Sequence, residues 1–154
     1  MNKSKGFTLI ELLVVVAIIG LLASIITFSV STSRMRARDT RRITDMKQVK
    51  TGLDLYFTSG GGYPAKATWD ANIGASLLCN GEMMLTVPHD PISPTYDYTY
   101  SQTGAVISGC GGTVGRGYDL QFYIESRGQY YIMDEDGNLR DAVTGSPASF
   151  DSLL

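Results

Sequence analysis

A single carboxylate, Glu11, lies in a long apolar stretch near the start of the chain. It follows Gly6-Phe7-Thr8-Leu9-Ile10, and residues 12–33 then carry no charge. A charged side chain in a membrane-length apolar helix costs a few kcal/mol and normally has a partner. Cleavage after Gly6 would create an α-amino group on Phe7, and such a group is cationic at neutral pH. These residues therefore predict a cleavage site after Gly6 and an ion pair between Glu11 and the Phe7 amine of a neighbouring copy.

The alternatives for this stretch are an ordinary secretory signal peptide, cut near Ala23-Ser24, and a simple membrane anchor. The apolar run continues past Ala23, and the basic region before it is only six residues long. Neither alternative explains why Glu11 lies inside the run. Processing after Gly6 is the favoured interpretation.

The residues Gly6-Phe7-Thr8-Leu9-Ile10-Glu11, with the apolar run behind them, resemble the prepilin leader of type IV pilins and type II secretion pseudopilins. The resemblance implies that a prepilin peptidase removes residues 1–6 and that the new Phe7 amine is N-methylated. It also implies that Glu11 recruits the next subunit by pairing with a Phe7 amine as a filament grows. With the helix that follows, the similarity extends to about Pro64.

The same resemblance implies a location and a set of partners. The precursor is expected to cross the inner membrane once, with its N-terminus in the cytoplasm and lipid around its apolar run. An assembly platform and a cytoplasmic ATPase then draw it into a helical filament of its own copies, on the cell surface or across the periplasm. The more basic flank follows the run, so charge counting alone favours the opposite orientation. The leader decides the prediction, because its processing needs cytoplasmic access to Gly6.

Four segments are expected along the chain. Residues 1–6 form the cleaved leader, and residues 7–33 form the membrane or filament-core helix. Residues 34–58 continue that helix in amphipathic form, with an apolar stripe at helical spacing, namely Ile43, Met46, Val49 and Leu53. A glycine run followed by Pro64 ends the helix, and residues 59–154 form the head.

The head is expected to be a small antiparallel sheet. Alternation at period two predicts strands over residues 96–101 and 118–125, and a third strand is expected over residues 130–134. Residues 65–95 are predicted to be loop-rich, with a short helix near residues 69–78. The predicted fold class is α+β, a long N-terminal helix packed on a small antiparallel sheet, and the pilin resemblance implies the same architecture.

Charge is distributed unevenly, although the net charge is only −2. Residues 34–50 hold seven basic and two acidic side chains, whereas residues 51–154 hold four basic and twelve acidic ones. The favoured interpretation is contact between the basic segment and the acidic heads of neighbouring subunits, ahead of lipid headgroups. No specific nucleic-acid partner is predicted.

The two cysteines, Cys79 and Cys110, are predicted to form a disulfide. A head outside the cytoplasm lies where disulfides persist. The bond would close a loop of about 30 residues and stabilise the fold by roughly 3–4 kcal/mol. The alternative is a pair of free thiols.

Asp134, Asp136 and Asn138 offer oxygen ligands at alternate positions, which partly resembles the start of a calcium loop. The pattern departs from the EF-hand, which needs glycine where Leu139 stands. An acidic hairpin turn is the alternative. The resemblance to major pseudopilins, which carry calcium in the C-terminal head, keeps calcium as a candidate ligand. No cofactor is predicted to be required.

No hydrolase elbow, phosphate loop or zinc signature is present in the sequence, so an enzyme is not predicted. The predicted function is that of a structural subunit of a type IV pilus-like filament, serving adhesion, motility or DNA uptake. The alternative is a major pseudopilin of a type II protein secretion system. A more distant alternative is a membrane-tethered extracytoplasmic binding module that does not polymerise.

Overall fold

The structure is a computed structural model that describes residues 6–110 and 112–153. It divides into two compact units, the N-terminal unit, which ends at Met35, and the head unit, which begins at Arg36. Helix α1 (Leu9–Gly60) contributes to both units. Apart from Gly6, the predicted leader lies outside the described residues, and the predicted segment limits stay predictions.

Helix α1 ends where the glycine run predicts. Gly61 has φ of 75°, a left-handed conformation that glycine adopts without strain. Its N–H donates to the Phe57 carbonyl at 2.7 Å and so satisfies one of the last carbonyls of the helix. The helix begins and ends two residues later than the predicted range of 7–58.

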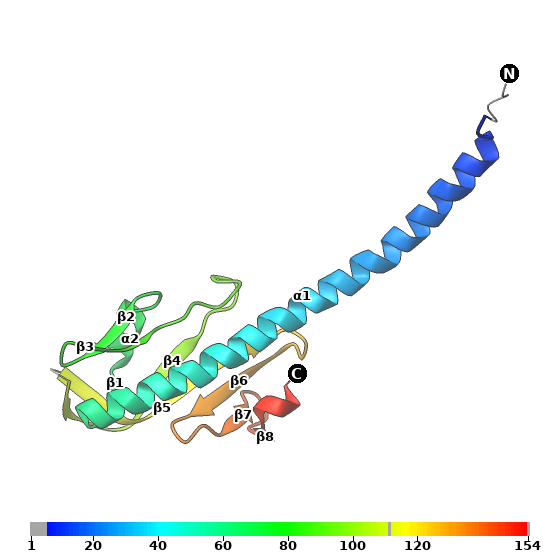
Figure 1. Ribbon diagram of the computed structural model, residues 1–154. Helices are drawn as coiled ribbons and strands as arrows, with labels where there is room; N and C mark the ends of the chain where they lie inside the picture. Colours follow the sequence, from blue (N-terminus) through cyan, green and yellow to red (C-terminus); the bar gives the residue numbers. More distant parts are fainter. Residues whose placement is uncertain (1–5, 111, 154) are drawn as a thin grey trace. The chain divides into compact units, whose positions relative to one another are not determined.

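A six-stranded antiparallel sheet lies against the α1 residues of the head unit (Figure 1). Strand β5 (Gly112–Ile124) is its centre and pairs along one edge with β4 (Thr99–Gly109). Its other edge pairs with β1 (Tyr63–Pro64) near its start and with β6 (Gln129–Asp134) near its end. Strands β7 (Leu139–Asp141) and β8 (Pro147–Ala148) continue the sheet beyond β6, and a single 3-10 turn, η1 (Phe150–Ser152), follows.

The core of the head unit lies between α1 and this sheet. The predicted stripe of Ile43, Met46, Val49 and Leu53 is buried. It belongs to one cluster with the inward side chains of the sheet, which include Tyr100, Val114, Tyr118, Leu120, Phe122, Ile124 and Met133. The α+β architecture is therefore confirmed.

The prediction for residues 65–95 is partly wrong. A short helix, α2, covers Lys66–Ala71 instead of residues 69–78, and a hairpin of β2 (Ser76–Cys79) and β3 (Glu82–Thr86) follows it. Asn80 and Gly81 connect the two strands with φ of 52° and 85°. An Asn-Gly pair is a strong hairpin signal because both turn residues need positive φ. The sequence contained this signal, and the prolines from Pro88 onward obscured it.

Candidate functional site

The predicted cleavage site is exposed and lies outside regular secondary structure. Gly6, Phe7 and Thr8 precede α1 and carry no regular secondary structure. The Phe7 side chain is 87% exposed, and a Cβ added to Gly6 would meet nothing within 4 Å. A protease needs an accessible, non-helical peptide bond, and the Gly6–Phe7 bond meets that requirement.

Glu11 caps the start of α1. Its Oε2 accepts hydrogen bonds from the Thr8 backbone N–H at 2.9 Å and from the Thr8 hydroxyl at 2.7 Å. The Thr8 Oγ1 in turn accepts from the Glu11 N–H at 3.3 Å, which completes a capping box. The Glu11 carboxylate is therefore bonded to Thr8, the residue that follows Phe7. Among the described residues Glu11 forms no ion pair, so its negative charge is available to a cation outside the chain.

The apolar side chains that follow Glu11 are uncovered in the chain. The large apolar residues between positions 9 and 22 are 47–82% exposed. Among the described residues, α1 is the one helix long and apolar enough to cross a membrane. Exposed apolar surface of this extent requires lipid or protein to cover it.

Several of the basic residues between positions 34 and 50 find partners within the head unit, which the sequence reasoning did not foresee. Arg42 is completely buried. Its Nε and Nη2 donate to the two oxygens of Asp90 at 2.6 and 2.9 Å. Its Nη1 donates to Asp39 at 3.0 Å and to Glu125 at 2.5 Å. A buried guanidinium needs this set of acceptors, because an unpaired buried charge is very costly.

The same cluster joins α1 to the turn between β5 and β6. Arg38 forms a two-bond contact with Glu125 at 2.9 and 2.6 Å. The Asp39 carboxylate accepts the backbone N–H groups of Glu125 and Ser126, both at 2.9 Å. The hydrogen bond from Arg38 lowers the pKa of Glu125, although burial opposes the shift. Part of the basic segment thus holds its own head in place, and exposed Arg36, Arg41 and Lys47 stay available to other molecules.

Cys79 and Cys110 are joined in a disulfide, which links β2 to the end of the β4–β5 hairpin. The bond lies against the end of α1, where a Cβ on Gly60 would collide with the Cys110 sulfur. A residue with a Cβ at this position would therefore displace the disulfide, which explains glycine at position 60. The disulfide fastens the hairpin β2–β3 to the rest of the head.

The predicted calcium ligands lie in the turn between β6 and β7. Asp134 Oδ1 accepts the backbone N–H groups of Asp136 and Asn138 at 3.1 and 2.8 Å. The Lys50 ammonium donates to the Glu135 carbonyl at 3.3 Å, so a cation already lies against this turn. The Lys50 ammonium would repel a calcium ion bound at this turn. Calcium at Asp134, Asp136 and Asn138 stays a prediction.

Comparison with known proteins gives matches to both the start and the body of the chain. A family model described as the prokaryotic N-terminal methylation motif matches residues 1–27. The type II secretion system core protein G of Vibrio cholerae is 30% identical over 105 residues, which is 64% of this chain and 72% of that protein. A fimbrial protein of Pseudomonas aeruginosa is 30% identical over 128 residues, 77% of this chain and 83% of that protein. The core protein G of Escherichia coli is 33% identical over 63 residues, 41% of this chain, and the match spans only 43% of that protein. No solved structure matches significantly.

Proposed function

Because the chain belongs to the family of type IV pilins and type II secretion pseudopilins, we propose that it is a structural subunit of a type IV pilus-like filament. A prepilin peptidase cuts the Gly6–Phe7 bond, and the new Phe7 amine is methylated. The apolar part of α1 holds the subunit in the inner membrane, with the N-terminus in the cytoplasm, and later becomes the core of the filament. The work of the protein is mechanical, and it catalyses no reaction.

The observation that carries this proposal is the pairing of an exposed cleavage site with a carboxylate that has no ion pair in the described chain. Glu11 is held by Thr8 at the start of α1, and the apolar side chains that follow are uncovered. A neighbouring Phe7 amine would neutralise Glu11, and neighbouring helices would cover the apolar surface. If every subunit makes one such ion pair and one such helix contact, each subunit is shifted by the same distance along the filament axis relative to the one before it.

The proposed assembly partners are the prepilin peptidase, the inner-membrane assembly platform and its ATPase. The family membership supports these partners. Before assembly the partner of α1 is membrane lipid. The filament serves adhesion, motility or DNA uptake.

The direct test is the mass of the N-terminal peptide of the protein purified from its own cells. We expect a peptide that begins at Phe7 and carries one added methyl group. A chain that begins at Met1 would instead indicate a tethered module, and the proposal would fail. A chain that begins after residue 22 would indicate an ordinary signal peptide, with the same consequence.

A second candidate is a major pseudopilin of a type II secretion system, favoured by the match over 72% of the Vibrio cholerae core protein G. The two candidates share the leader, so processing does not distinguish them. Deletion of the gene for this chain should abolish surface filaments if the chain is a pilin. It should block the release of secreted enzymes if the chain is a pseudopilin. A calcium-dependent rise in the Tm of the purified chain, absent with magnesium and abolished in Asp134→Ala, would favour the pseudopilin.

A further inference from the structure

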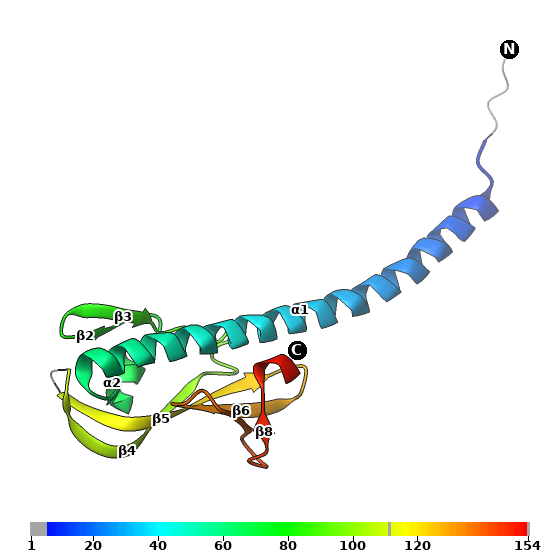
Figure 2. The same ribbon diagram turned by 60° about the horizontal axis from the view of Figure 1, so that its bottom comes forward.

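One end of the head unit brings together three segments that are distant in sequence. Asp39 of α1 accepts the backbone N–H groups of Glu125 and Ser126, in the turn between β5 and β6. The loop between β7 and β8 lies at the same end, since the Ala142 N–H donates to the Tyr130 carbonyl beside that turn. In Figures 1 and 2 the β5–β6 turn lies beside α1 and close to η1. We call this end of the head unit the near end, and it comprises residues 36–42, 125–130 and 142–146.

The near end lies within reach of a bilayer that the apolar run of α1 crosses. The uncharged run, residues 12–33, matches the ~20 residues that cross the hydrocarbon core, so Ser33 would lie at its edge. Arg38 follows Ser33 by five positions, and five residues span at most about 18 Å in any conformation. Arg38 in turn holds Glu125 of the turn by hydrogen bonds of 2.9 and 2.6 Å. Chain connectivity therefore keeps the near end close to the membrane surface in an anchored subunit.

The near end carries an exposed apolar tip. Val143 is 87% exposed, more than any other large apolar side chain of the head unit that the structure describes. Its loop is uncharged from Ala142 onward to Phe150. The carboxylate of Asp141 accepts the N–H groups of Val143 and Thr144, both at 2.8 Å, and so holds the valine in one position. An uncharged apolar tip beside a bilayer suits the boundary between headgroups and acyl chains.

A row of tyrosines lies next to this tip. Tyr130 of β6 is 37% exposed, and its ring centre lies 4.9 Å from that of Tyr123 on β5. The Tyr123 ring stacks on that of Tyr96, with ring centres 4.1 Å apart. Tyrosine combines an apolar ring with a polar hydroxyl and is enriched at membrane–water interfaces for that reason. The row and the valine are therefore side chains of the kinds that enter the interfacial layer of a bilayer.

The charges around the near end are compatible with such a contact. Asp39, Asp90 and Glu125 pair with arginines of α1. The exposed charges there are three basic and two acidic side chains, namely Arg36, Arg41, Arg127, Asp97 and Asp151. Guanidinium groups bind lipid phosphates, and a balance this close to neutral does not require a strong excess of anionic lipid. The surface that fits the near end is therefore a lipid bilayer.

We propose that the near end of the head unit rests on the bilayer before assembly, with Val143 and Tyr130 in the headgroup layer. This contact rests on the proposed membrane-anchored subunit and adds a second lipid contact to that of the apolar run. It restrains the head of a subunit that waits in the membrane. The assembly machinery then has to break this contact as well when it draws the subunit into a filament.

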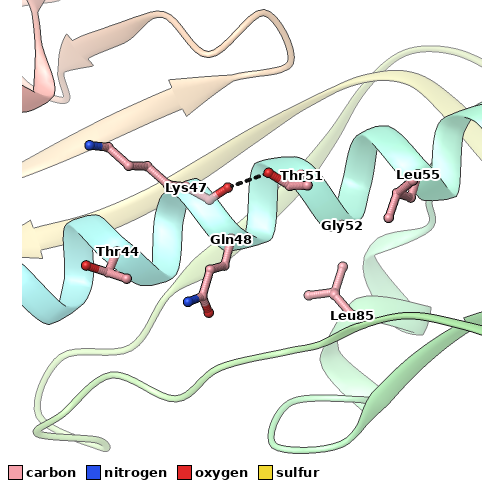
Figure 3. Close-up of a pocket in the computed structure, with 7 residues that line it drawn as sticks. All are labelled: Thr44, Lys47, Gln48, Thr51, Gly52, Leu55 and Leu85. Carbon is pink, nitrogen blue, oxygen red and sulfur yellow. Dashed lines mark hydrogen bonds between the residues drawn. The ribbon is translucent and has the colours of Figure 1, made fainter.

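Another exposed apolar surface of the head unit lies too far away to share the contact. Leu55 of α1 and Leu85 of β3 face a groove beside the helix (Figure 3). Leu55 follows Arg36 on α1 by 19 positions, which is about 28 Å of helix. The groove therefore supplies a control position, Thr51, which lines it and whose hydroxyl donates to the Lys47 carbonyl.

Quenching by a lipid-bound nitroxide tests the contact in the full chain, reconstituted into phosphatidylcholine vesicles. The native cysteines are paired with each other, so a single added cysteine can carry a fluorophore. With the nitroxide on the lipid headgroup, we expect the label at Val143→Cys to lose most of its fluorescence and the label at Thr51→Cys to keep it. Equal quenching at both positions, or none at Val143→Cys, overturns the contact and leaves the proposed function intact. A chain that does not float with the vesicles overturns both.

A second test changes the tip and reads the contact elsewhere at the near end. The label is placed at Ser126→Cys, because the bond from Ser126 to Asp39 comes from the backbone and is kept. Val143→Asp should remove most of the quenching of this label, since a charge is expelled from the interfacial layer, whereas Val143→Leu should retain it. Val106→Asp on β4, 59% exposed, is the control and should also retain it. Unchanged quenching in Val143→Asp overturns the contact.

Discussion

The two units of the chain differ in whether their charged and apolar side chains are paired and covered within the unit. In the head unit Arg42 is fully buried among three carboxylates, and the apolar stripe of α1 is covered by the sheet. In the N-terminal unit the apolar side chains are exposed, and within the described residues the Glu11 carboxylate bonds to Thr8. The head unit pairs the buried Arg42 and covers the apolar stripe of α1 within itself, whereas the exposed apolar side chains of the N-terminal unit need lipid or other copies to cover them.

The largest expected effect comes from the charge in the N-terminal unit. We expect Glu11→Gln to be processed normally but to form filaments more than about a hundredfold less efficiently, because breaking a desolvated ion pair costs about 3–5 kcal/mol. An amide at this position still accepts from Thr8, so the helix cap is kept and the charge alone is lost. The measurement is the amount of filament sheared from cells, relative to processed protein in the membrane.

The same variant should leave the head unit unchanged. Urea unfolding of the purified chain in detergent, followed by the fluorescence of buried Trp69, should give the same midpoint as the natural chain. Normal filaments from both Glu11→Gln and Glu11→Ala would contradict the role given to this residue.

The next largest effect is expected in the head unit, at the buried guanidinium. Arg42→Met should lower the free energy of unfolding by about 3–5 kcal/mol, because it leaves Asp39 and Asp90 without their cation and leaves Glu125 with Arg38 alone. Arg41→Met is the control, since the Arg41 side chain is 66% exposed and should cost less than about 1 kcal/mol. Urea unfolding measures both. Equal costs for the two variants would show that the buried cluster does not stabilise the head unit.

Removal of the disulfide should have a slightly smaller effect and stay within the head unit. The double variant Cys79→Ser/Cys110→Ser opens a loop with a sequence separation of 31 and should lose about 3–4 kcal/mol. Processing after Gly6 should continue at the natural rate, as mass spectrometry of the N-terminal peptide can check. A defect in processing would mean that the two units are less independent than proposed.

The N-terminal unit was easier to predict than the head unit, for a physical reason. Its information is local, because an uncharged run and a capping pair act within a few residues of each other. The helix of residues 7–58 was therefore predicted to within two residues at each end. The apolar stripe on α1 and the strands of the sheet could also be predicted, since apolar residues repeat about every 3.6 residues in a helix and every two residues in a strand.

The buried charge cluster could not be predicted from the sequence, because two of the acids that bind Arg42 are far from it along the chain. Asp90 and Glu125 lie 48 and 83 residues from Arg42. Charge counting predicts that the basic segment faces the acidic heads of other subunits, whereas four of its members pair with acids of their own chain. The Asn80-Gly81 hairpin was missed for a different reason. Its turn signal is local, but the prolines that follow favoured a loop over this whole region.

The smallest expected effects separate two carboxylates of the head unit by the sign of their pH dependence. The hydrogen bond from Arg38 lowers the pKa of Glu125. The stability that Glu125 contributes is present above its unfolded pKa, about 4.3, and is lost as the pH falls through the folded value. Burial raises the pKa of Asp45, although the Tyr98 hydroxyl opposes the shift. The contribution of Asp45 is present below about pH 3.9 and is lost as the pH rises through its folded value.

Two neutral variants should therefore diverge when unfolding is measured from pH 3 to pH 7. Glu125→Gln should lose stability relative to the natural chain as the pH rises, and Asp45→Asn should gain it. Each slope is limited to about 1.4 kcal/mol per pH unit, because each variant removes one titrating group. Slopes of the same sign would mean that Asp45 is held mainly by its charge, through Arg41, and not by its burial. Parallel curves with no slope would mean that neither carboxylate changes its pKa on folding. The comparison of the two units would then rest on Arg42 alone, since only its burial would distinguish the head unit from an ordinary charged surface.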